Sequence, residues 1–186
     1  AANIIRWHTE LGYELLKNAP DSDILAPHVA YEHHEHQDGS GAPRGLVGSN
    51  KVERQRGTSG PVPTLIGEIA AVANIYDMLL SGGDNREPVT TDVALAAIRK
   101  AAGSHFNKAI VDAFVRTVPV YPRATAVRII SDRCKNHLAV VVEVHPANLG
   151  RPLIRVIRDN HGQEIEPFEI DLRKEPDIEI RCLGIS

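Results

Sequence analysis

The chain is 186 residues long and 42% of them are apolar, which is enough to bury the core of one ordinary domain and a small one. This composition excludes an intrinsically disordered chain. The formal net charge of −3, with both signs interspersed, excludes a general electrostatic attraction for nucleic acid polymers.

The small number of cysteines indicates where in the cell the protein is found. Cys134 and Cys182 are the only cysteines, and two distant thiols in a chain of this size are typical of a reduced, cytoplasmic protein. No apolar run is long enough for a membrane span and no signal peptide is visible, so we expect no membrane attachment. The chain has no initiator methionine and opens in a helical pattern. We therefore expect it to be an N-terminally truncated piece of a longer protein.

Helical periodicity dominates the first part of the chain and predicts an all-α unit. The second predicted helix runs to His36, so that a histidine pair lies at its C-terminal end, where the helix dipole favours cations. Residues 37–63 are rich in glycine and proline and show no periodicity, which is typical of a functional loop. The predicted helices cover residues 3–18, 23–36, 64–81, 90–102 and 108–116.

The pattern changes to short β-branched runs after Val120. Turn sequences separate these runs, which predicts a small antiparallel sheet or barrel. We therefore predict a mainly α fold followed by a small antiparallel β domain, with domains at 1–119 and 120–186. The predicted strands cover residues 126–130, 138–144, 153–157, 165–170 and 178–181.

The most informative segment lies at the end of the second predicted helix. Residues 33–38 read His-His-Glu-His-Gln-Asp and lead into a glycine-rich turn that ends at Pro43. Imidazole and carboxylate together are a ligand set for a transition metal, which can polarise a phosphoryl oxygen. The alternative is that these side chains are solvated at a helix end or make structural hydrogen bonds.

This segment resembles the HD-GYP family of cyclic di-GMP phosphodiesterases, which belongs to the HD superfamily. His33 and His34 match the family's histidine pair, and His8 matches the lone histidine of its H-x-x-x-G helix. Residues 73–77 (Ala-Asn-Ile-Tyr-Asp) resemble a helix that carries a metal-binding aspartate, and residues 103–107 (Gly-Ser-His-Phe-Asn) resemble its G-T-H-F-D segment. The resemblance covers essentially the whole chain and implies the helical bundle of the HD superfamily for the predicted helical unit.

The resemblance also implies a metal site and a substrate site, although it identifies no catalytic residue. Glu35 and Asp77 are expected to orient the metal ligands. The implied metal ligands are His8, His33, His34 and, at a degenerate position, Asn74. The implied substrate contacts are Asp38, Gly39, Gly41, Ala42, Pro43 and Arg86.

Two carboxylates and the remaining histidines can also be explained by structural roles. Asp38 either orients a histidine ligand or caps the glycine-rich turn. Asp77, if buried, needs a partner such as the backbone or Arg86. His105 is expected to order a loop rather than to bind metal. Surface positions are expected for His28, His36, His137, His145 and His161.

The chain departs from the family at positions that the chemistry uses. An N-terminal His-Asp pair is absent, Asn74 stands for aspartate, Ala42 for the signature tyrosine, and Gly83 for a phosphate-contacting arginine. We therefore favour a degenerate domain of bacterial cyclic di-GMP signalling, with a regulatory or interaction role and weak or no hydrolysis. The alternative is an active metal-dependent phosphodiesterase in the full-length protein. The glycine-rich turn disfavours a third choice, an HD-superfamily hydrolase of other nucleotides.

The resemblance finally implies a cofactor and partners. The cofactor is a divalent transition metal, iron or manganese, and a domain without metal is the alternative. The implied partners are cyclic di-GMP or other signalling proteins such as GGDEF domains, and a homodimer is a further expectation.

Overall fold

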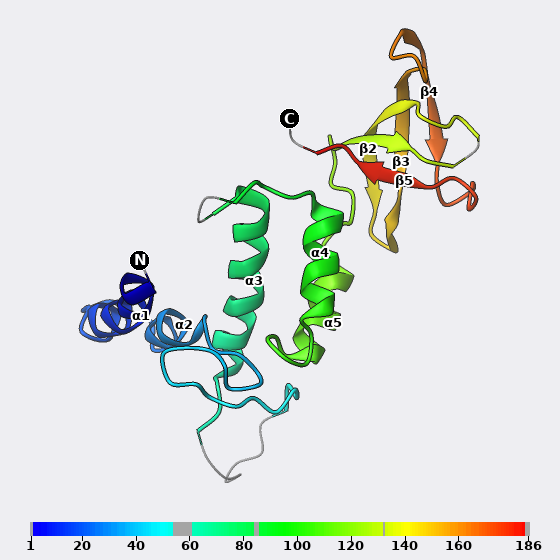
Figure 1. Ribbon diagram of the computed structural model, residues 1–186. Helices are drawn as coiled ribbons and strands as arrows, with labels where there is room; N and C mark the ends of the chain where they lie inside the picture. Colours follow the sequence, from blue (N-terminus) through cyan, green and yellow to red (C-terminus); the bar gives the residue numbers. More distant parts are fainter. Residues whose placement is uncertain (1, 54–60, 84–85, 132, 185–186) are drawn as a thin grey trace. The chain divides into compact units, whose positions relative to one another are not determined.

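The computed structural model describes residues 2–53, 61–83, 86–131 and 133–184, with side chains from Trp7 onward (Figure 1). These residues form two compact units, one of Ala1–Met78 with Ala97–Phe114 and one of Leu79–Ala96 with Val115–Ser186. The domain boundary that we predict between residues 119 and 120 stays a prediction. None of the described helices is both long and apolar enough to cross a membrane.

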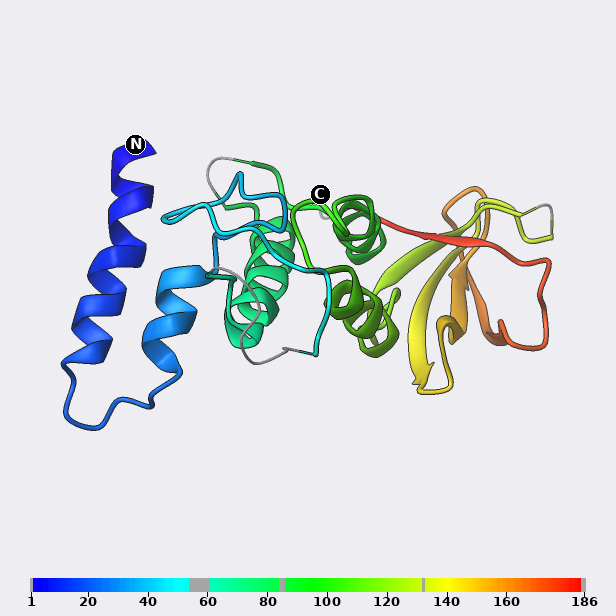
Figure 2. The same ribbon diagram turned by 90° about the horizontal axis from the view of Figure 1, so that it is seen from below.

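The first unit begins with two helices that pack side by side, α1 (Ala2–Lys17) and α2 (Ala26–Glu32) (Figure 2). Gly12 allows their close approach, because a Cβ atom there would lie 3.2 Å from the Cβ of Ala30. α2 has only seven residues and is much shorter than the predicted helix 23–36. His33 is its C-cap residue, so the histidine pair follows the helix instead of lying within its last turn.

Three further helices follow, α3 (Leu65–Ser81), α4 (Thr91–Lys100) and α5 (Lys108–Thr117), with bounds close to those predicted. Thr64 caps α3, since its carbonyl accepts the N–H of Glu68 at 3.0 Å and its hydroxyl accepts the N–H of Gly67 at 3.2 Å. Gly82 ends α3 in the left-handed conformation, with φ of 71°.

The second unit contains an antiparallel sheet in the order β4-β3-β2-β1-β5. Its strands are β1 (Ala126–Ile129), β2 (Leu138–His145), β3 (Asn148–Arg158), β4 (Glu164–Asp171) and β5 (Ile180–Cys182). Alternate residues of the central strands point into one core, as the pleat requires. That core consists of Val127, Ile129, Ala139, Val141, Ile154, Val156, Ile170, Leu172, Ile178 and Ile180.

The predicted fold class, a mainly α helical bundle of the HD superfamily followed by a small antiparallel β domain, is wrong. In the described residues five helices are accompanied by a five-stranded sheet that occupies the C-terminal part of the chain. The β-branched runs of this part assemble a core of their own. In the first unit, backbone N–H groups of described residues between α2 and α3 donate to the buried carboxylates of Glu32 and Glu35. The helices and the sheet together give a mixed α and β protein.

Candidate functional site

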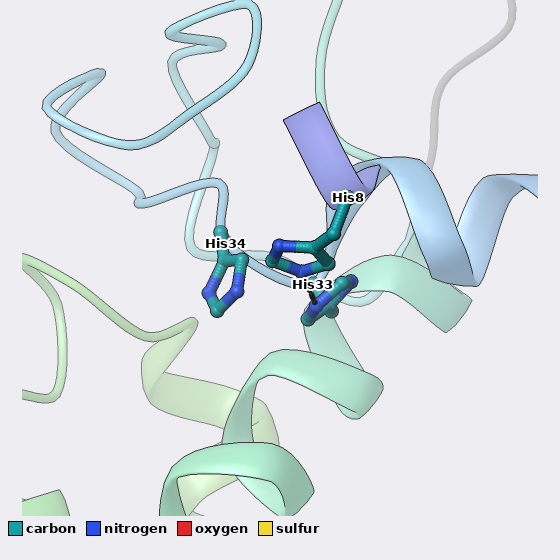
Figure 3. A group of neighbouring side chains, drawn as sticks. All are labelled: His8, His33 and His34. Carbon is teal, nitrogen blue, oxygen red and sulfur yellow. Dashed lines mark hydrogen bonds between the residues drawn. The ribbon is translucent and has the colours of Figure 1, made fainter. Parts of the chain in front are cut away.

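Three histidines converge in the first unit (Figure 3). His8 comes from α1, whereas His33 and His34 follow the end of α2. One ring nitrogen of each lies within 4.8 Å of those of the other two. Their ring centroids lie 4.1 Å apart for His33 and His34, and 5.1 to 5.2 Å from His8 to each of them. The histidines predicted as metal ligands are therefore neighbours, and their binding of a metal stays a prediction.

The backbone of α2 fixes the proton of His33. Its Nδ1 lies 3.0 Å from the carbonyl oxygen of Val29, which can only accept, so Nδ1 carries the hydrogen and Nε2 the lone pair. That Nε2 faces Nε2 of His8 at 3.2 Å. Burial lowers the pKa of His33 below its usual value, and the nearby His8 acts in the same direction against the opposing bond to Val29. A neutral imidazole with a free Nε2 is the form that binds metals.

The spacing of His8 and His33 fits a divalent transition metal, and His34 lies close enough to be a third ligand candidate. Two nitrogens about 2.1 Å from one metal, at tetrahedral or octahedral angles, lie about 3.0 to 3.4 Å apart. The 3.2 Å between His8 and His33 falls in this range. His8 is exposed and the other two rings are half-buried, so a metal has access from solvent. Among the described residues, no carboxylate joins this group of histidines.

Glu35 organises the turn beside the histidines. It is buried, and its two carboxylate oxygens each accept a backbone N–H at 2.7 Å, from Arg44 and from Leu46. Both oxygens are thus used by the chain that follows the glycine-rich turn. The orienting role toward the metal ligands that we predicted for Glu35 stays a prediction.

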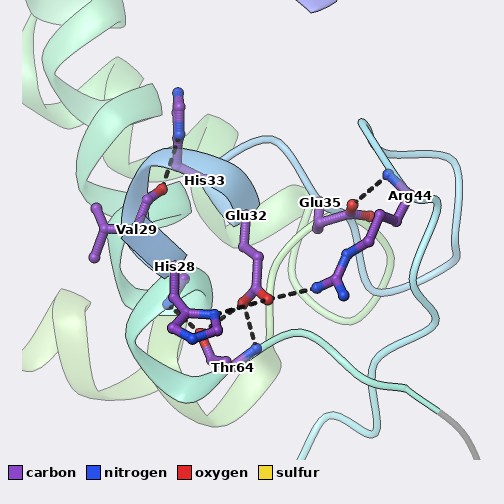
Figure 4. Close-up of polar contacts among 8 residues, drawn as sticks. His28, Val29, Glu32, His33, Glu35, Arg44 and Thr64 are labelled. Carbon is purple, nitrogen blue, oxygen red and sulfur yellow. Dashed lines mark hydrogen bonds and ion pairs between the residues drawn. The ribbon is translucent and has the colours of Figure 1, made fainter. Parts of the chain in front are cut away.

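Glu32 is a structural residue of the site that the sequence analysis missed (Figure 4). This buried carboxylate accepts a hydrogen bond of 2.6 Å from Nη2 of Arg44. It also accepts the backbone N–H and the hydroxyl of Thr64, both at 2.6 Å. Glu32 therefore ties the end of α2 to the turn and to the start of α3. No pattern in the sequence distinguishes it from an exposed helical glutamate.

Two glycines make the turn possible. Gly39 has φ of 78°, a backbone conformation that is strained for any residue with a Cβ atom. At Gly41 a Cβ would lie 2.3 Å from the backbone nitrogen of His36 and 2.5 Å from the carbonyl oxygen of His34. Ala42 donates its N–H to the same carbonyl at 2.9 Å, and the Ala42–Pro43 peptide is cis. The predicted substrate-contacting segment is therefore packed directly against the backbone of the histidine segment.

Asp38 caps this turn, one of the two roles that the sequence left open. Its Oδ1 accepts the N–H of Ser40 at 2.9 Å and the hydroxyl of Ser40 at 2.6 Å. These two bonds lower the pKa of Asp38 below its usual value, so the carboxylate is ionised at neutral pH. No hydrogen bond from Asp38 to a histidine ring is formed among the described contacts.

A second buried polar network lies behind the turn. Gln37 donates from Nε2 to the carboxylate of Glu68 at 2.8 Å, and Asn107 donates to the other oxygen at 3.0 Å. All three side chains are buried. Gln37 also accepts the N–H of Asn50 at 3.0 Å, so one network joins the loop, α3 and the start of α5.

The remaining predicted site residues lie on α3 and after it. Asn74 is half-buried, and its side-chain amide donates to Sδ of Met78, one turn later, at 3.8 Å. Asp77 is exposed instead of buried, so burial does not oblige it to pair with Arg86. Arg86 is also exposed. The roles that we predicted for these residues stay predictions.

His145 in the second unit is the histidine whose predicted surface position is wrong. It is buried, with Nε2 3.6 Å from a carboxylate oxygen of Asp171 and Nδ1 3.7 Å from one of Glu143. Its place at the inward-facing end of β2 explains the burial.

The C-terminal part of the chain matches a family that is described as a KOW domain associated with HD domain, over residues 135–182. This match spans β2 to β5.

Three bacterial proteins are similar to a longer part of the chain. The cyclic di-GMP phosphodiesterase response regulator RpfG of Xanthomonas campestris is 37% identical over 115 residues, 61% of this chain and 27% of that protein. A cyclic di-GMP phosphodiesterase of Pseudomonas aeruginosa is 30% identical over 155 residues, 82% of this chain and 33% of that protein. A cyclic di-GMP phosphodiesterase of Thermotoga maritima is 31% identical over 114 residues, 61% of this chain and 28% of that protein. The chain thus spans a third or less of the length of these relatives.

Proposed function

This chain is a relative of the bacterial cyclic di-GMP phosphodiesterases of the HD-GYP type, and from that relationship we propose a regulatory role for it in cyclic di-GMP signalling. In this role it holds a divalent transition metal at His8, His33 and His34 and hydrolyses cyclic di-GMP weakly or not at all. The observation that carries the proposal is the ligand group itself, which contains three imidazoles and, among the described residues, no carboxylate.

The absence of a charged ligand in this group, among the residues that the structure describes, favours metal binding over efficient catalysis. A divalent metal, once bound, supplies a Lewis acid that polarises a phosphoryl oxygen. Three imidazoles supply nitrogen ligands but no negative charge, so the charge of +2 on the metal is not compensated. A carboxylate ligand would reduce the net charge of the centre and strengthen metal binding. Asn74 stands where the family has aspartate, and its amide is engaged with Met78 in its own helix. We therefore expect modest metal affinity and slow or absent turnover.

The substrate side of the proposal rests on the glycine-rich turn. Gly39 and Gly41 let the turn fold tightly against its own backbone beside the histidines, and this holds the segment that we propose to contact the ligand next to the metal ligands. Ala42 offers neither the hydroxyl nor the ring of the family's tyrosine. With Gly83 in place of an arginine, Arg86 is the cation that we propose for a phosphate contact. A site with fewer anchors is expected to bind cyclic di-GMP more weakly than an intact one.

A second candidate is an active phosphodiesterase in the whole protein. The approach of the ring nitrogens of His8, His33 and His34 within 4.8 Å favours it, because such a group is already arranged for metal binding. In that case further ligands come from chain outside this sequence.

The proposed partners follow from the same relationship. Cyclic di-GMP is the ligand, GGDEF-type signalling domains are protein partners, and a homodimer is the proposed assembly. We also propose that residues 1–119 and 120–186 act as separate functional parts.

The test compares the natural chain with Asn74→Asp. Each protein is loaded with Mn²⁺ or Fe²⁺, and metal content, cyclic di-GMP affinity and hydrolysis are measured. We expect metal and nucleotide binding with little hydrolysis in the natural chain, and at least tenfold tighter metal binding after Asn74→Asp. Hydrolysis by the natural chain at rates of active enzymes, about 1 per second or faster, would contradict the regulatory proposal and support the second candidate.

A further inference from the structure

A second pair of neighbouring histidines lies in the first unit, outside the group of His8, His33 and His34. His36 precedes the glycine-rich turn, and His105 lies between α4 and α5. Their ring centroids are 4.4 Å apart, with an angle of 52° between the ring planes. Two backbone hydrogen bonds hold the segments together, from Gln37 N to His105 O at 3.1 Å and from Asp38 N to Ser104 O at 2.9 Å. Distant parts of the chain are thus fixed beside each other at this point.

The hydrogen bonds around His36 leave its Nε2 as the free nitrogen. Ser40 donates its only hydroxyl hydrogen to Asp38, at 2.6 Å, because a carboxylate can only accept. The same hydroxyl oxygen lies 2.9 Å from Nδ1 of His36, so it must accept there and Nδ1 must carry the hydrogen. The ring is then oriented through Ser40 by a carboxylate, in the manner of a metal-binding histidine.

His105 is oriented in the same way by a second hydroxyl. Ser104 donates its hydrogen to the carbonyl oxygen of Ala101 at 3.2 Å. Its oxygen lies 3.3 Å from Nδ1 of His105 and accepts from it. The hydrogen of His105 is therefore also on Nδ1, and Nε2 carries the lone pair.

We propose that His36 and His105 form a second metal site, which binds a divalent transition ion such as Zn²⁺ or Ni²⁺ through the two Nε2 atoms. Imidazoles that share one metal at bond lengths of about 2.1 Å have centroids about 4.6 to 5.3 Å apart at octahedral to tetrahedral angles. The observed 4.4 Å lies just below this range, so the two rings need to move apart only slightly to share an ion. His105 is exposed and His36 half-buried, so the remaining coordination positions are open to water.

The charges around the pair support a metal ion. Asp38 acts electrostatically on both rings, and as an ionised carboxylate it favours a cation between them. With two protein ligands the site is weaker than a closed four-ligand site. A bound ion would link the turn at residues 36–40 to the connection at residues 104–105, and so stabilise the first unit by mass action.

The experiment uses the full chain and Zn²⁺ alone, followed by titration calorimetry and thermal melting. The His33→Ala/His34→Ala protein keeps only His8 of the first group of histidines, and we expect it to retain one Zn²⁺ per chain. When His105→Ala is added to this variant, the remaining ion should be lost or its affinity should fall at least tenfold. His161→Ala, an exposed histidine of the second unit, is the matched control and should leave binding unchanged.

Two outcomes would overturn the proposal: no Zn²⁺ on the His33→Ala/His34→Ala protein, or the same Zn²⁺ binding with and without His105. If that protein does not fold, the stoichiometry of the natural chain decides. It should bind two Zn²⁺ and the single variant His105→Ala one, whereas one ion in both would refute the second site.

Ser40→Ala separates orientation from mere proximity. It keeps both imidazoles but removes the hydroxyl that fixes the proton of His36. Loss of such an outer partner typically weakens metal binding about 10- to 100-fold, and we expect a decrease in that range. Unchanged affinity would show that the relay through Ser40 has no part in the site.

Discussion

Glu32 and Arg44 form an ion pair of 2.6 Å in which the carboxylate is buried and the guanidinium is partly open to solvent, with side-chain exposures of 1% and 36%. The Arg44 guanidinium also lies over the ring of Tyr31, 5.1 Å from its centroid. Through Glu32, which also binds Thr64, the histidine segment, the cis-proline turn and the start of α3 share one anchor.

Removal of this anchor should be costly. We expect Glu32→Ala to lower the free energy of unfolding by about 3 kcal/mol, because it leaves the donors of Arg44 and Thr64 without their acceptor. Urea denaturation measures the change. Glu10→Ala, which alters an exposed glutamate on α1, is the control and should change stability by less than about 0.5 kcal/mol. Equal effects of the two substitutions would contradict the anchoring role of Glu32.

The close packing at Gly41 predicts that a larger residue at this position destabilises the protein. A methyl group there would overlap the backbone of His34 and His36, so Gly41→Ala should destabilise the protein by about 2 kcal/mol. At Gly150 a Cβ meets no atom within 4 Å, which makes Gly150→Ala the matched control. Thermal melting compares the two, and a Gly41→Ala protein as stable as the control would show that the turn does not pack as described.

The stability of the second unit should depend on Asp171 at low pH. Its hydrogen bonds with Arg173 lower the pKa of Asp171 from 3.8 to about 2. A lowered folded-state pKa stabilises the fold above the unfolded value, and this contribution is lost as the pH falls from about 4 to 2. The difference in urea midpoint between the natural chain and Asp171→Asn should therefore be larger at pH 5 than at pH 2 and shrink as the pH falls through this interval. An equal difference at pH 5 and at pH 2 would rule out this linkage.

The two thiols should react differently. Burial, with the charge of Asp92, raises the pKa of Cys182 to about 12, so its reactive thiolate is scarce at pH 8. Cys134 is half-buried. Labelling with iodoacetamide at pH 8, read by mass spectrometry, should modify Cys134 first and Cys182 only after unfolding in urea. Rapid modification of Cys182 in the folded protein would contradict its buried position.

The regular elements were predictable because their signals are local. The apolar spacing of α3 and the β-branched run of β2 predict these elements to within one residue of their bounds, whereas β3 begins five residues before its predicted start. The helical bundle was an inference from resemblance, and it failed because the β-branched runs of the second unit assemble a sheet with a core of its own.

The sequence was enough to predict that His8, His33 and His34 lie together, but not which residues hold the segments around them in place. The spacing of His33, His34 and the turn is visible in the sequence, and the structure brings His8 beside them. Burial of Glu32 and of His145 depends on segments 32 and 26 positions away, Thr64 and Asp171, which no local pattern reports. The early end of α2 has the same origin, since Glu32 and Glu35 bind the following loop.

The most direct test of the proposed metal centre is the metal content of the natural chain compared with that of His33→Ala/His34→Ala, by elemental analysis after incubation with Mn²⁺. The difference in metal content between the two proteins does not count ions that both proteins bind at other sites. We expect the natural chain to hold one more Mn²⁺ per chain than the variant. Equal metal contents in two folded proteins would show that His8, His33 and His34 do not form a metal site.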